Sequence, residues 1–332
     1  MKRPSRTIPA TLLGLGLVTA LVWVISPWPA ALLIRGVFEK GAANAVTEMK
    51  PYVPKDAVDE RLDLSYSDGD RDARFDVFTP KGNSDPLPTV VWIHGGAWIS
   101  GSKNNVDPYV KIIASHGFTT VSLGYTVAPE ATYPTALTQL NTALAFLVAN
   151  AAKFHIDPSK IVLAGDSAGA QLTAQLATMV TSPVYAQKVG ITPALSQQQL
   201  RAVILDCGIY DVRKIPAAPG IGGWGFRIAL WAYLGTKNWA DTAGGEEMTT
   251  IDDVTADFPT TWISGGNADP LTSGQSVVMA QRLRALGVDV TPVFYSADHK
   301  PALPHEYQFH LKLKDARTAL QSTVAFLGRV VS

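Results

Sequence analysis

Residues 163–171 read LAGDSAGAQ, and the GDSAG at 165–169 within them fits the pattern G-x-S-x-G. The apolar run IVLAGD at 161–166 predicts a buried strand that ends just before Ser167. The run SAGAQLTAQLATMV, which begins at Ser167, predicts a helix. Ser167 is therefore expected at a sharp strand-to-helix turn, where the two glycines leave room for neighbouring backbone and the hydroxyl is exposed above the sheet edge.

The bulk composition limits what kind of protein this is. Of its 332 residues, 47% are apolar and 17% are charged, which is typical of a well-packed globular protein and argues against disorder. The net charge is zero, so no basic surface for nucleic-acid binding is predicted. The one cysteine, Cys207, cannot form an internal disulfide, and no Cys/His cluster has metal-ligand spacing, so we expect no metal site.

Strand-like and helical patterns alternate along the chain. LDLSYS and ARFDVFT alternate in polarity on either side of a polar turn, which predicts a hairpin. Continuous apolar runs predict buried strands at 89–94, 118–125, 161–166, 202–208, 260–266 and 290–296. Helices are predicted at 133–154, 167–180, 273–287 and 306–328. This alternation predicts an α/β fold with a mostly parallel, doubly wound sheet, whose active site lies at the carboxyl ends of the strands.

The N-terminus differs from the rest of the chain. Lys2, Arg3 and Arg6 precede an uncharged stretch at 7–34, and residues 8–26 are nearly all apolar or small. Because a membrane-spanning helix needs about 20 such residues, this stretch predicts an uncleaved anchor. A cleaved signal peptide stays open as the alternative, although the Pro-Trp-Pro that follows is a poor cleavage neighbour. In both cases the positive-inside rule places the remainder outside the cytoplasm, anchored to the membrane or secreted.

We therefore divide the chain into three parts. Residues 1–35 are the signal anchor or signal peptide, 36–60 a linker or N-terminal cap segment, and 61–332 the α/β domain. Within this domain, residues 211–258 interrupt the alternation and are rich in aromatic residues and glycine. We interpret them as a small helical cap over the carboxyl edge of the sheet. Its aromatic side chains predict an apolar pocket, for which the candidates are Trp98, Trp224 and Trp231.

A second motif, HGGAW at 94–98, directly follows the predicted strand 89–94. Two adjacent glycines there leave backbone N–H groups free to point at a ligand. The loop is similar to the oxyanion-hole loop of lipases and esterases, which implies donors at Gly95, Gly96 and Ala168. A third segment, LGYTVAPEATYPTAL at 123–137, resembles a segment found in one group of these enzymes.

The three motifs together resemble the hormone-sensitive-lipase-like carboxylesterases of the α/β-hydrolase fold, over about residues 60–330. The resemblance implies Ser167 as the nucleophile, followed in chain order by an acid and a histidine. Asp269, in GGNADPL just beyond the predicted strand 260–266, matches the acid, with Asp298 in reserve. His305, in LPHEYQF, matches the base, with His299 as the alternative.

The resemblance also implies supporting roles. His94 is expected to brace its loop rather than act as the base, and Asp166 and Glu130 are expected to hold the loops of the site. His310 is expected within the last helix. The chain departs from the family where His-Glu-Tyr replaces the usual His-Gly-Phe, and a glutamate beside the base either raises its pKa or faces solvent.

The predicted function is a serine carboxylesterase acting on short- to medium-chain, small apolar esters, without a metal or organic cofactor. One alternative is an amidase or deacetylase of the arylacetamide-deacetylase or formamidase type, because the sequence does not separate esters from amides. Another is a non-catalytic receptor that uses the same pocket for binding, which a complete set of serine, acid and histidine disfavours.

Overall fold

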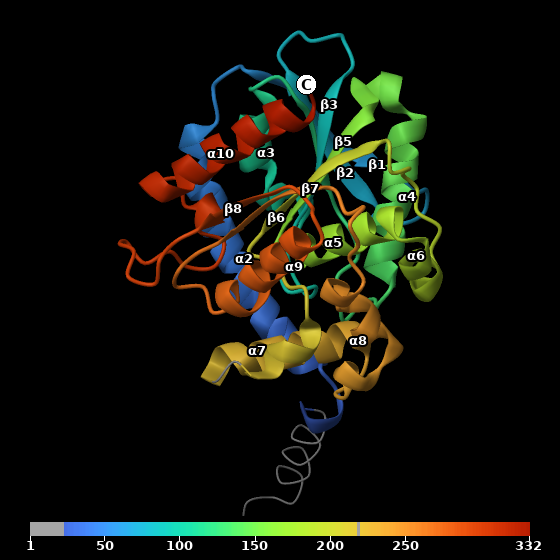
Figure 1. Cartoon of the computed structure of the whole chain (residues 1–332), viewed down its shortest axis with the longest axis vertical. Helices are drawn as coiled ribbons and strands as arrows, with labels where there is room; N and C mark the ends of the chain where they lie inside the picture. Colours follow the sequence, from blue (N-terminus) through green and yellow to red (C-terminus); the bar gives the residue numbers. More distant parts are fainter. Residues whose placement is uncertain (1–22, 218–219) are drawn as a thin grey trace, which may run out of the picture.

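The computed structural model describes residues 23–217 and 220–332, which are built around one eight-stranded sheet (Figure 1). The strand order is β1-β2-β4-β3-β5-β6-β7-β8, and all neighbours pair in parallel except β1 with β2 and β2 with β4. The strands are β1 Val58–Ser65, β2 Arg74–Pro80, β3 Leu87–Ile93, β4 Thr119–Leu123, β5 Ile156–Asp166, β6 Leu200–Asp206, β7 Thr260–Gly265 and β8 Val290–Phe294.

Every apolar run that we predicted to be a strand lies in this sheet. The central strands are buried over most of their length, and in β5 this holds for its second half, because helices cover both faces of the sheet. The predicted hairpin is the antiparallel pair of β1 and β2 at one edge, where β1 is largely exposed. The expectation of a mostly parallel sheet is therefore confirmed.

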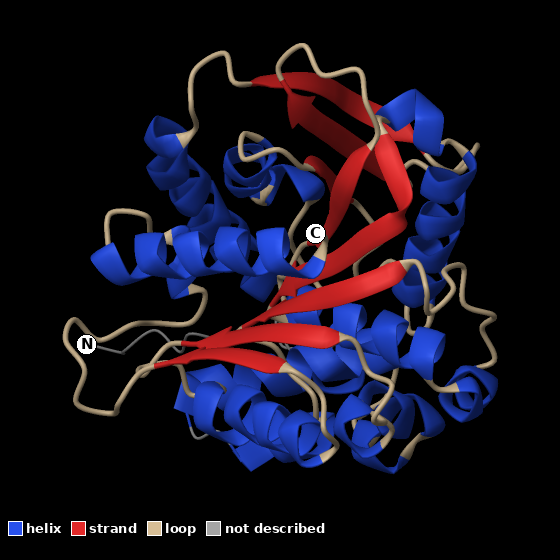
Figure 2. Ribbon diagram, turned by 45° about the horizontal axis from the view of Figure 1, so that its top comes forward, coloured by secondary structure: helices blue, strands red, loops and turns tan. Residues whose placement is uncertain are grey.

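Helices form a layer on each face of the twisted sheet (Figure 2). One core lies beneath α3 and α10, and the other beneath α4, α5 and α9. The helices of the structure are α2 Trp28–Met49, α3 Asp107–Ala114, α4 Thr135–Ala149, α5 Ala168–Thr181, α6 Pro183–Val189, α7 Gly220–Leu234, α8 Ala243–Met248, α9 Val277–Ala285 and α10 Lys314–Val330.

Two helix predictions need correction. The sequence patterns missed α3 and α6, which are only two turns long and therefore too short for a clear period. The last helix begins at Lys314 instead of residue 306, since the chain first makes a short turn over Tyr307–Phe309. His310 therefore lies before the last helix, contrary to our expectation.

The N-terminal boundary that we predicted at residue 35 falls inside α2. Ala31 and Ile34 of this helix are buried in the core beneath α4, α5 and α9, and Met49 at its end is buried in the other core. No helix within residues 23–217 and 220–332 is long and apolar enough to cross a membrane. Most of the apolar stretch on which the anchor prediction rests lies in residues 1–22, outside the described residues.

Arg35 ties α2 to two loops of the α/β domain. Its Nε donates to the carbonyl of Ile99 at 2.6 Å, and one terminal nitrogen donates to the carbonyl of Ala128 at 2.7 Å. The guanidinium also binds both carboxylate oxygens of Glu130, at 2.7 and 2.5 Å. A paired fork of this kind is stronger than a single neutral hydrogen bond. Arg35, with Glu130 as its ion-pair partner, thus holds α2 against the loop that follows β3 and the loop that follows β4.

The predicted insertion at 211–258 contains α7 and α8 with short turns at Val212–Ala217, Trp239–Asp241 and Thr250–Asp252. Figure 1 shows α7 and α8 side by side below the sheet, with the start of α2 next to α7. Contacts between α2 and α7 close this side of the molecule. Two segments far apart in the sequence therefore form one cover over the domain.

Replacing Arg35 with alanine removes the hydrogen bonds that dock α2. We expect the free energy of unfolding to fall by about 1–3 kcal/mol, because the carbonyls of Ile99 and Ala128 lose their charged donor in partly buried contacts. Urea unfolding followed by circular dichroism measures this change. Lys40→Gln is the matched control, since it removes one positive charge from the exposed part of the same helix and is expected to change little. Equal effects of the two changes would contradict the docking role of Arg35.

Candidate active site

Ser167 lies at the turn between β5 and α5, with a positive φ of 50° and ψ of −116°. The turn depends on its two glycines. A Cβ at Gly169 would overlap the carbonyl oxygen of Ile93, and one at Gly165 would lie 2.5 Å from the backbone of Gly169. The strand and helix can therefore approach closely enough to hold Ser167 at the carboxyl edge of the sheet.

Three side chains from separate loops meet at this edge. The Nε2 of His305 lies 2.9 Å from Ser167 Oγ, and its Nδ1 lies 2.9 Å from Asp269 Oδ2. Asp269 follows β7, and its other oxygen accepts the N–H of Leu271 at 2.9 Å. The side chain of Asp269 is fully buried, so this carboxylate has a fixed orientation towards the imidazole. The structure thus brings together the three residues that the sequence assigned to the site.

The other downstream histidines and the reserve acid do not contact Ser167. His299 faces Asp315, with 3.2 Å between Nε2 and Oδ1, and does not reach Ser167. His310 contacts Glu48 on α2, with 3.3 Å between Nδ1 and Oε2. Asp298 follows β8 on a fully exposed loop. Of the three downstream histidines, His305 is therefore the one in a position to exchange a proton with the hydroxyl of Ser167.

His94 supports the glycine loop from beneath. Its Nδ1 lies 2.8 Å from the carbonyl oxygen of Gly95, and its ring stacks on Tyr125 with 4.3 Å between the ring centres. Tyr125 in turn donates its hydroxyl to the carbonyl of His94 at 2.8 Å. Burial lowers the pKa of His94 to about 4, so its imidazole is neutral. These contacts fix the path of the loop that passes Ser167.

Asp166 decides which N–H groups of this loop are free. Its buried carboxylate accepts the indole N–H of Trp92 at 2.7 Å and the backbone N–H of Gly95 at 2.8 Å. We expected Gly95 to be an oxyanion donor, and this assignment needs correction because its N–H is already bound. Within the described residues, no hydrogen bond is made by the N–H of Gly96, Ala97 or Ala168. Ala97, which the sequence analysis did not consider, therefore offers a further free N–H in this loop.

A cavity of about 410 Å³ opens in front of Ser167. The glycine loop and His305 form its floor. Its walls are largely apolar and come from α2, α7 and the turn before α10: Val37, Phe38, Gly41, Ala42, Ala45, Phe226 and Phe309. Residues 37, 41 and 45 are four positions apart, and this helical spacing is the signal in the sequence that could have indicated that α2 presents one face to the cavity.

Comparison with known proteins now decides the family. The profile of the BD-FAE family matches residues 75–283. Carboxylesterase NlhH of Mycobacterium tuberculosis is 36% identical over 292 residues, which cover 84% of each chain. The chain belongs to the hormone-sensitive-lipase-like esterases. A shorter match at 29% identity covers 38% of the putative alpha/beta hydrolase R526 of Acanthamoeba polyphaga mimivirus.

Solved structures of other esterases share the fold of this chain. Esterase B from Lactobacillus rhamnosis superimposes with a TM-score of 0.77 at 22% identity, covering 91% of this chain and 96% of that chain. An esterase from Pyrobaculum calidifontis has a TM-score of 0.71 at 22% identity, covering 91% of this chain and 94% of that chain. These likenesses establish the α/β-hydrolase fold. As a member of this family, the chain is a carboxylic ester hydrolase.

None of the three tryptophans predicted for the pocket of this esterase is among the residues that line the cavity. Trp98 is buried behind the glycine loop, where it stacks on Tyr233 and donates to Gln171 at 3.1 Å. Trp231 packs under the ammonium of Lys237. Trp224 is 37% exposed on α7. The sequence shows which residues are aromatic, but the direction in which the side chains of Trp224 and Trp231 point depends on how α7 packs.

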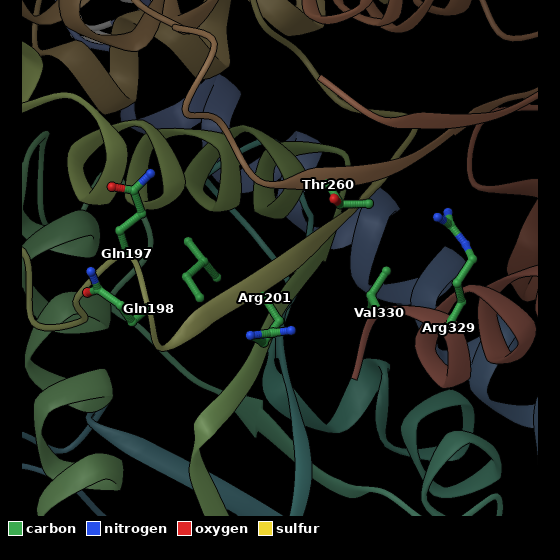
Figure 3. A pocket seen from close by; sticks show the side chains of 7 residues that line it. Gln197, Gln198, Arg201, Thr260, Arg329 and Val330 are labelled. Carbon is green, nitrogen blue, oxygen red and sulfur yellow. The ribbon is translucent and has the colours of Figure 1, made fainter. Parts of the chain in front are cut away.

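A second hollow of the esterase lies at the other end of the sheet (Figure 3), where β6 and β7 begin. Arg201 and Arg329 flank it, and Gln197, Gln198 and Thr260 complete its polar wall. No serine, cysteine or histidine lines it. The chemistry of the esterase therefore belongs to the cavity at Ser167.

One group of side chains in the described part of this esterase has metal-ligand spacing: Cys207, Asp269 and His305 offer ligand atoms within 4.8 Å of one another. In this group Asp269 and His305 already bind each other, and His305 also binds Ser167. Burial raises the pKa of the Cys207 thiol well above its usual value, which keeps it protonated and a poor metal ligand. The arrangement suits proton transfer rather than metal binding.

The acidic groups around His305 favour the protonated form of its imidazole. Burial of His305 opposes a positive charge, but the hydrogen bond and negative charge of Asp269 outweigh it. The charges of Glu306 and Asp166 add to this effect, and together they raise the pKa of His305 to about 9. Glu306 is the closer of these two additional acids, with 3.8 Å between its Oε1 and His305 Nε2.

We expect kcat/KM for a neutral ester to rise with pH up to an apparent pKa of about 9, because only neutral His305 can accept the proton of Ser167. Glu306→Gln removes one negative charge near His305 Nε2. In this variant we expect kcat/KM to rise at lower pH than in the unmodified chain. Asp298→Asn, which removes an exposed charge outside the cavity, serves as the control. A profile already flat above pH 7 in the unmodified chain would contradict the raised pKa of His305.

Proposed function

We propose that this chain is a serine carboxylesterase that hydrolyses short- to medium-chain esters through an acyl-enzyme. The observation that carries this proposal is the unbroken pair of 2.9 Å contacts from Ser167 to His305 to Asp269, at the floor of an apolar cavity. Each group stands where its role requires: a nucleophile beside a base, and a base oriented by an acid.

In the first half of the reaction, Ser167 Oγ attacks the carbonyl carbon of the ester and His305 Nε2 takes the hydroxyl proton. Asp269 holds Nδ1–H and stabilises the imidazolium that forms. The negative charge on the former carbonyl oxygen is stabilised by the free N–H groups of Gly96, Ala97 and Ala168. Since Ala168 begins α5, the dipole of that helix favours the same charge.

The tetrahedral intermediate then breaks its bond to the alcohol oxygen, which takes the proton from His305 Nε2. The alcohol leaves, and the acyl group remains bonded to Ser167. Water attacks this acyl-enzyme while His305 accepts one of its protons, and the second tetrahedral intermediate collapses to free acid and regenerated serine. The cycle adds one water across the ester bond and needs no other reactant.

The size and lining of the cavity support short to medium acyl chains. Its volume of about 410 Å³ is in the range of small-molecule sites. Phe38 and Phe226 provide apolar walls on two helices, with Gly41 and Ala42 leaving space between them. Amide hydrolysis would use the same groups. Comparing turnover of an ester with turnover of an amide separates the two reactions.

We also propose that the chain is held at a membrane by its N-terminal segment, with the esterase domain outside the cytoplasm. Two observations support this. Residues 8–26 form an apolar stretch behind three positive charges. In addition, exposed apolar side chains continue along the N-terminal part of α2: Trp28, Leu32, Leu33, Val37 and Phe38. The last two of these also line the cavity.

The first test of the esterase proposal is turnover of p-nitrophenyl acetate, butyrate, octanoate and palmitate, beside p-nitroacetanilide as the amide. We expect hydrolysis of the shorter esters, a decline towards palmitate and little amide cleavage. Ser167→Ala and His305→Ala should each lower kcat by about 10⁴-fold or more, and Asp269→Asn by about 10³–10⁴-fold. His299→Ala, the other histidine considered as base, is the matched control and should retain activity.

Labelling with a fluorophosphonate identifies the nucleophile independently of the substrate. Mass spectrometry should find the phosphonyl group on Ser167. Faster turnover of the anilide than of all esters would replace esterase with amidase. If the folded chain showed neither turnover nor labelling, a non-catalytic ligand-binding protein would replace the esterase proposal.

Membrane attachment is tested by fractionating cells that express the full chain, with a sodium carbonate wash at high pH. We expect the chain to remain in the membrane fraction, with an intact N-terminus, because the apolar stretch stays in the bilayer. A soluble, exported chain that begins after residue 26 would support the cleaved signal instead. A soluble chain with an intact N-terminus would overturn both proposals.

A further inference from the structure

Glu306 is an acidic side chain with no hydrogen-bond partner in the described part of the chain, and it faces the reacting atoms. Its carboxylate lines the cavity, and its Oε1 lies 3.8 Å from His305 Nε2. The side chain is 32% exposed, so it is neither buried in the protein nor free in bulk solvent. Its φ of 55° is in the left-handed region, and this backbone conformation accompanies the placement of the carboxylate beside the base.

The carboxylate of Glu306 is unbalanced in the reactive form of the site, in which His305 is neutral so that it can accept the proton of Ser167. Among the residues that line the cavity there is no lysine or arginine, and His305 is the one nitrogen base within 4 Å of Glu306. The oxygens of Asp166, another lining residue, are bound by Trp92 and Gly95, and burial together with the charge of Glu306 raises the pKa of Asp166 well above its usual value, so the negative charge at this place is that of Glu306. His94 is neutral through burial. A bound substrate therefore meets a negative potential next to the reaction centre.

Such a potential is unfavourable for ordinary ester hydrolysis, because the transition state itself carries a negative oxygen. A substrate with a positive charge near the same place would offset the repulsion. The position of that charge follows from the mechanism, since the leaving alcohol oxygen must lie within hydrogen-bond reach of His305 Nε2. Glu306 is close to the same nitrogen, so it faces the alcohol half of the ester rather than the bond to Ser167.

We infer that the cavity contains a cation subsite on the alcohol side, formed by the Glu306 carboxylate with the aromatic walls of Phe38 and Phe226, which favours esters of amino or ammonium alcohols. Aromatic faces and a carboxylate are the two groups that attract quaternary ammonium ions. A cation two carbons from the ester oxygen would lie within several ångströms of Glu306. This inference rests on the proposed esterase function and adds the class of alcohol.

The decisive experiment compares two esters of the same shape. Butyrylcholine carries a trimethylammonium group where 3,3-dimethylbutyl butyrate carries a neutral tert-butyl group. The measured quantity is the ratio of kcat/KM for butyrylcholine to kcat/KM for the neutral ester. Because the ratio is taken within one protein at one pH, a change in the pKa of His305 affects both substrates and cancels.

We expect this ratio to exceed one in the unmodified chain and to fall by roughly tenfold in Glu306→Gln, which keeps the shape and removes the charge. Glu306→Gly is the second variant, since glycine adopts a positive φ without strain and keeps the test possible if the glutamine variant is unstable. Asp298→Asn, which removes an exposed charge outside the cavity, should leave the ratio unchanged. A ratio of one or less in the unmodified chain, or one that the Glu306 variants do not lower, overturns the inference.

A binding measurement separates failure of this inference from failure of the esterase proposal. Ser167→Ala is titrated with choline and with 3,3-dimethylbutanol in a calorimeter, and the double variant with Glu306→Gln is titrated in parallel. Tighter binding of choline that depends on Glu306 supports the subsite even if no ester is hydrolysed. Equal binding of the two alcohols overturns it, whatever the activity of the unmodified chain.

Discussion

The backbone conformation at Ser167 is the constraint on which the rest of the site depends. Its φ of 50° and ψ of −116° are rarely adopted by a residue with a side chain, and such conformations cost about 1–3 kcal/mol. The turn persists because β5 and α5 are buried in the two cores and because Gly165 and Gly169 let their backbones touch. The loops after β7 and β8 then need only reach the same edge for His305 and Asp269 to meet the serine.

Negative charge is the second feature that shapes the site. Asp269 orients the imidazole, and Asp166 fixes the glycine loop through the N–H of Gly95. Together with Glu306, these acids stabilise a protonated His305, which suits the step in which the alcohol takes a proton. The same charges oppose the oxyanion, so stabilisation of that oxygen depends on the few N–H groups that remain free.

The helix α2 connects the N-terminal segment to this chemistry. Arg35 and Glu130 dock this helix on the loops after β3 and β4. Val37 and Phe38, which follow Arg35 in the helix, line the cavity. The sequence patterns predicted a connecting segment here with some helix. They did not reveal its place in the cavity wall, because the docking residues are separated by about a hundred positions and no local period reports such a pair.

The local elements could be predicted from the residues alone: the apolar runs that became buried strands, the strand–turn–helix at Ser167, and the order of serine, acid and histidine along the chain. These depend on residue type and short-range spacing, which are visible without a structure. The folded arrangement was needed to show that Asp166 binds the N–H of Gly95, that the predicted tryptophans pack away from the cavity, and that Glu306 faces the base. Each of these depends on which distant segments occupy the same space, and that is settled only when the two cores close around the sheet.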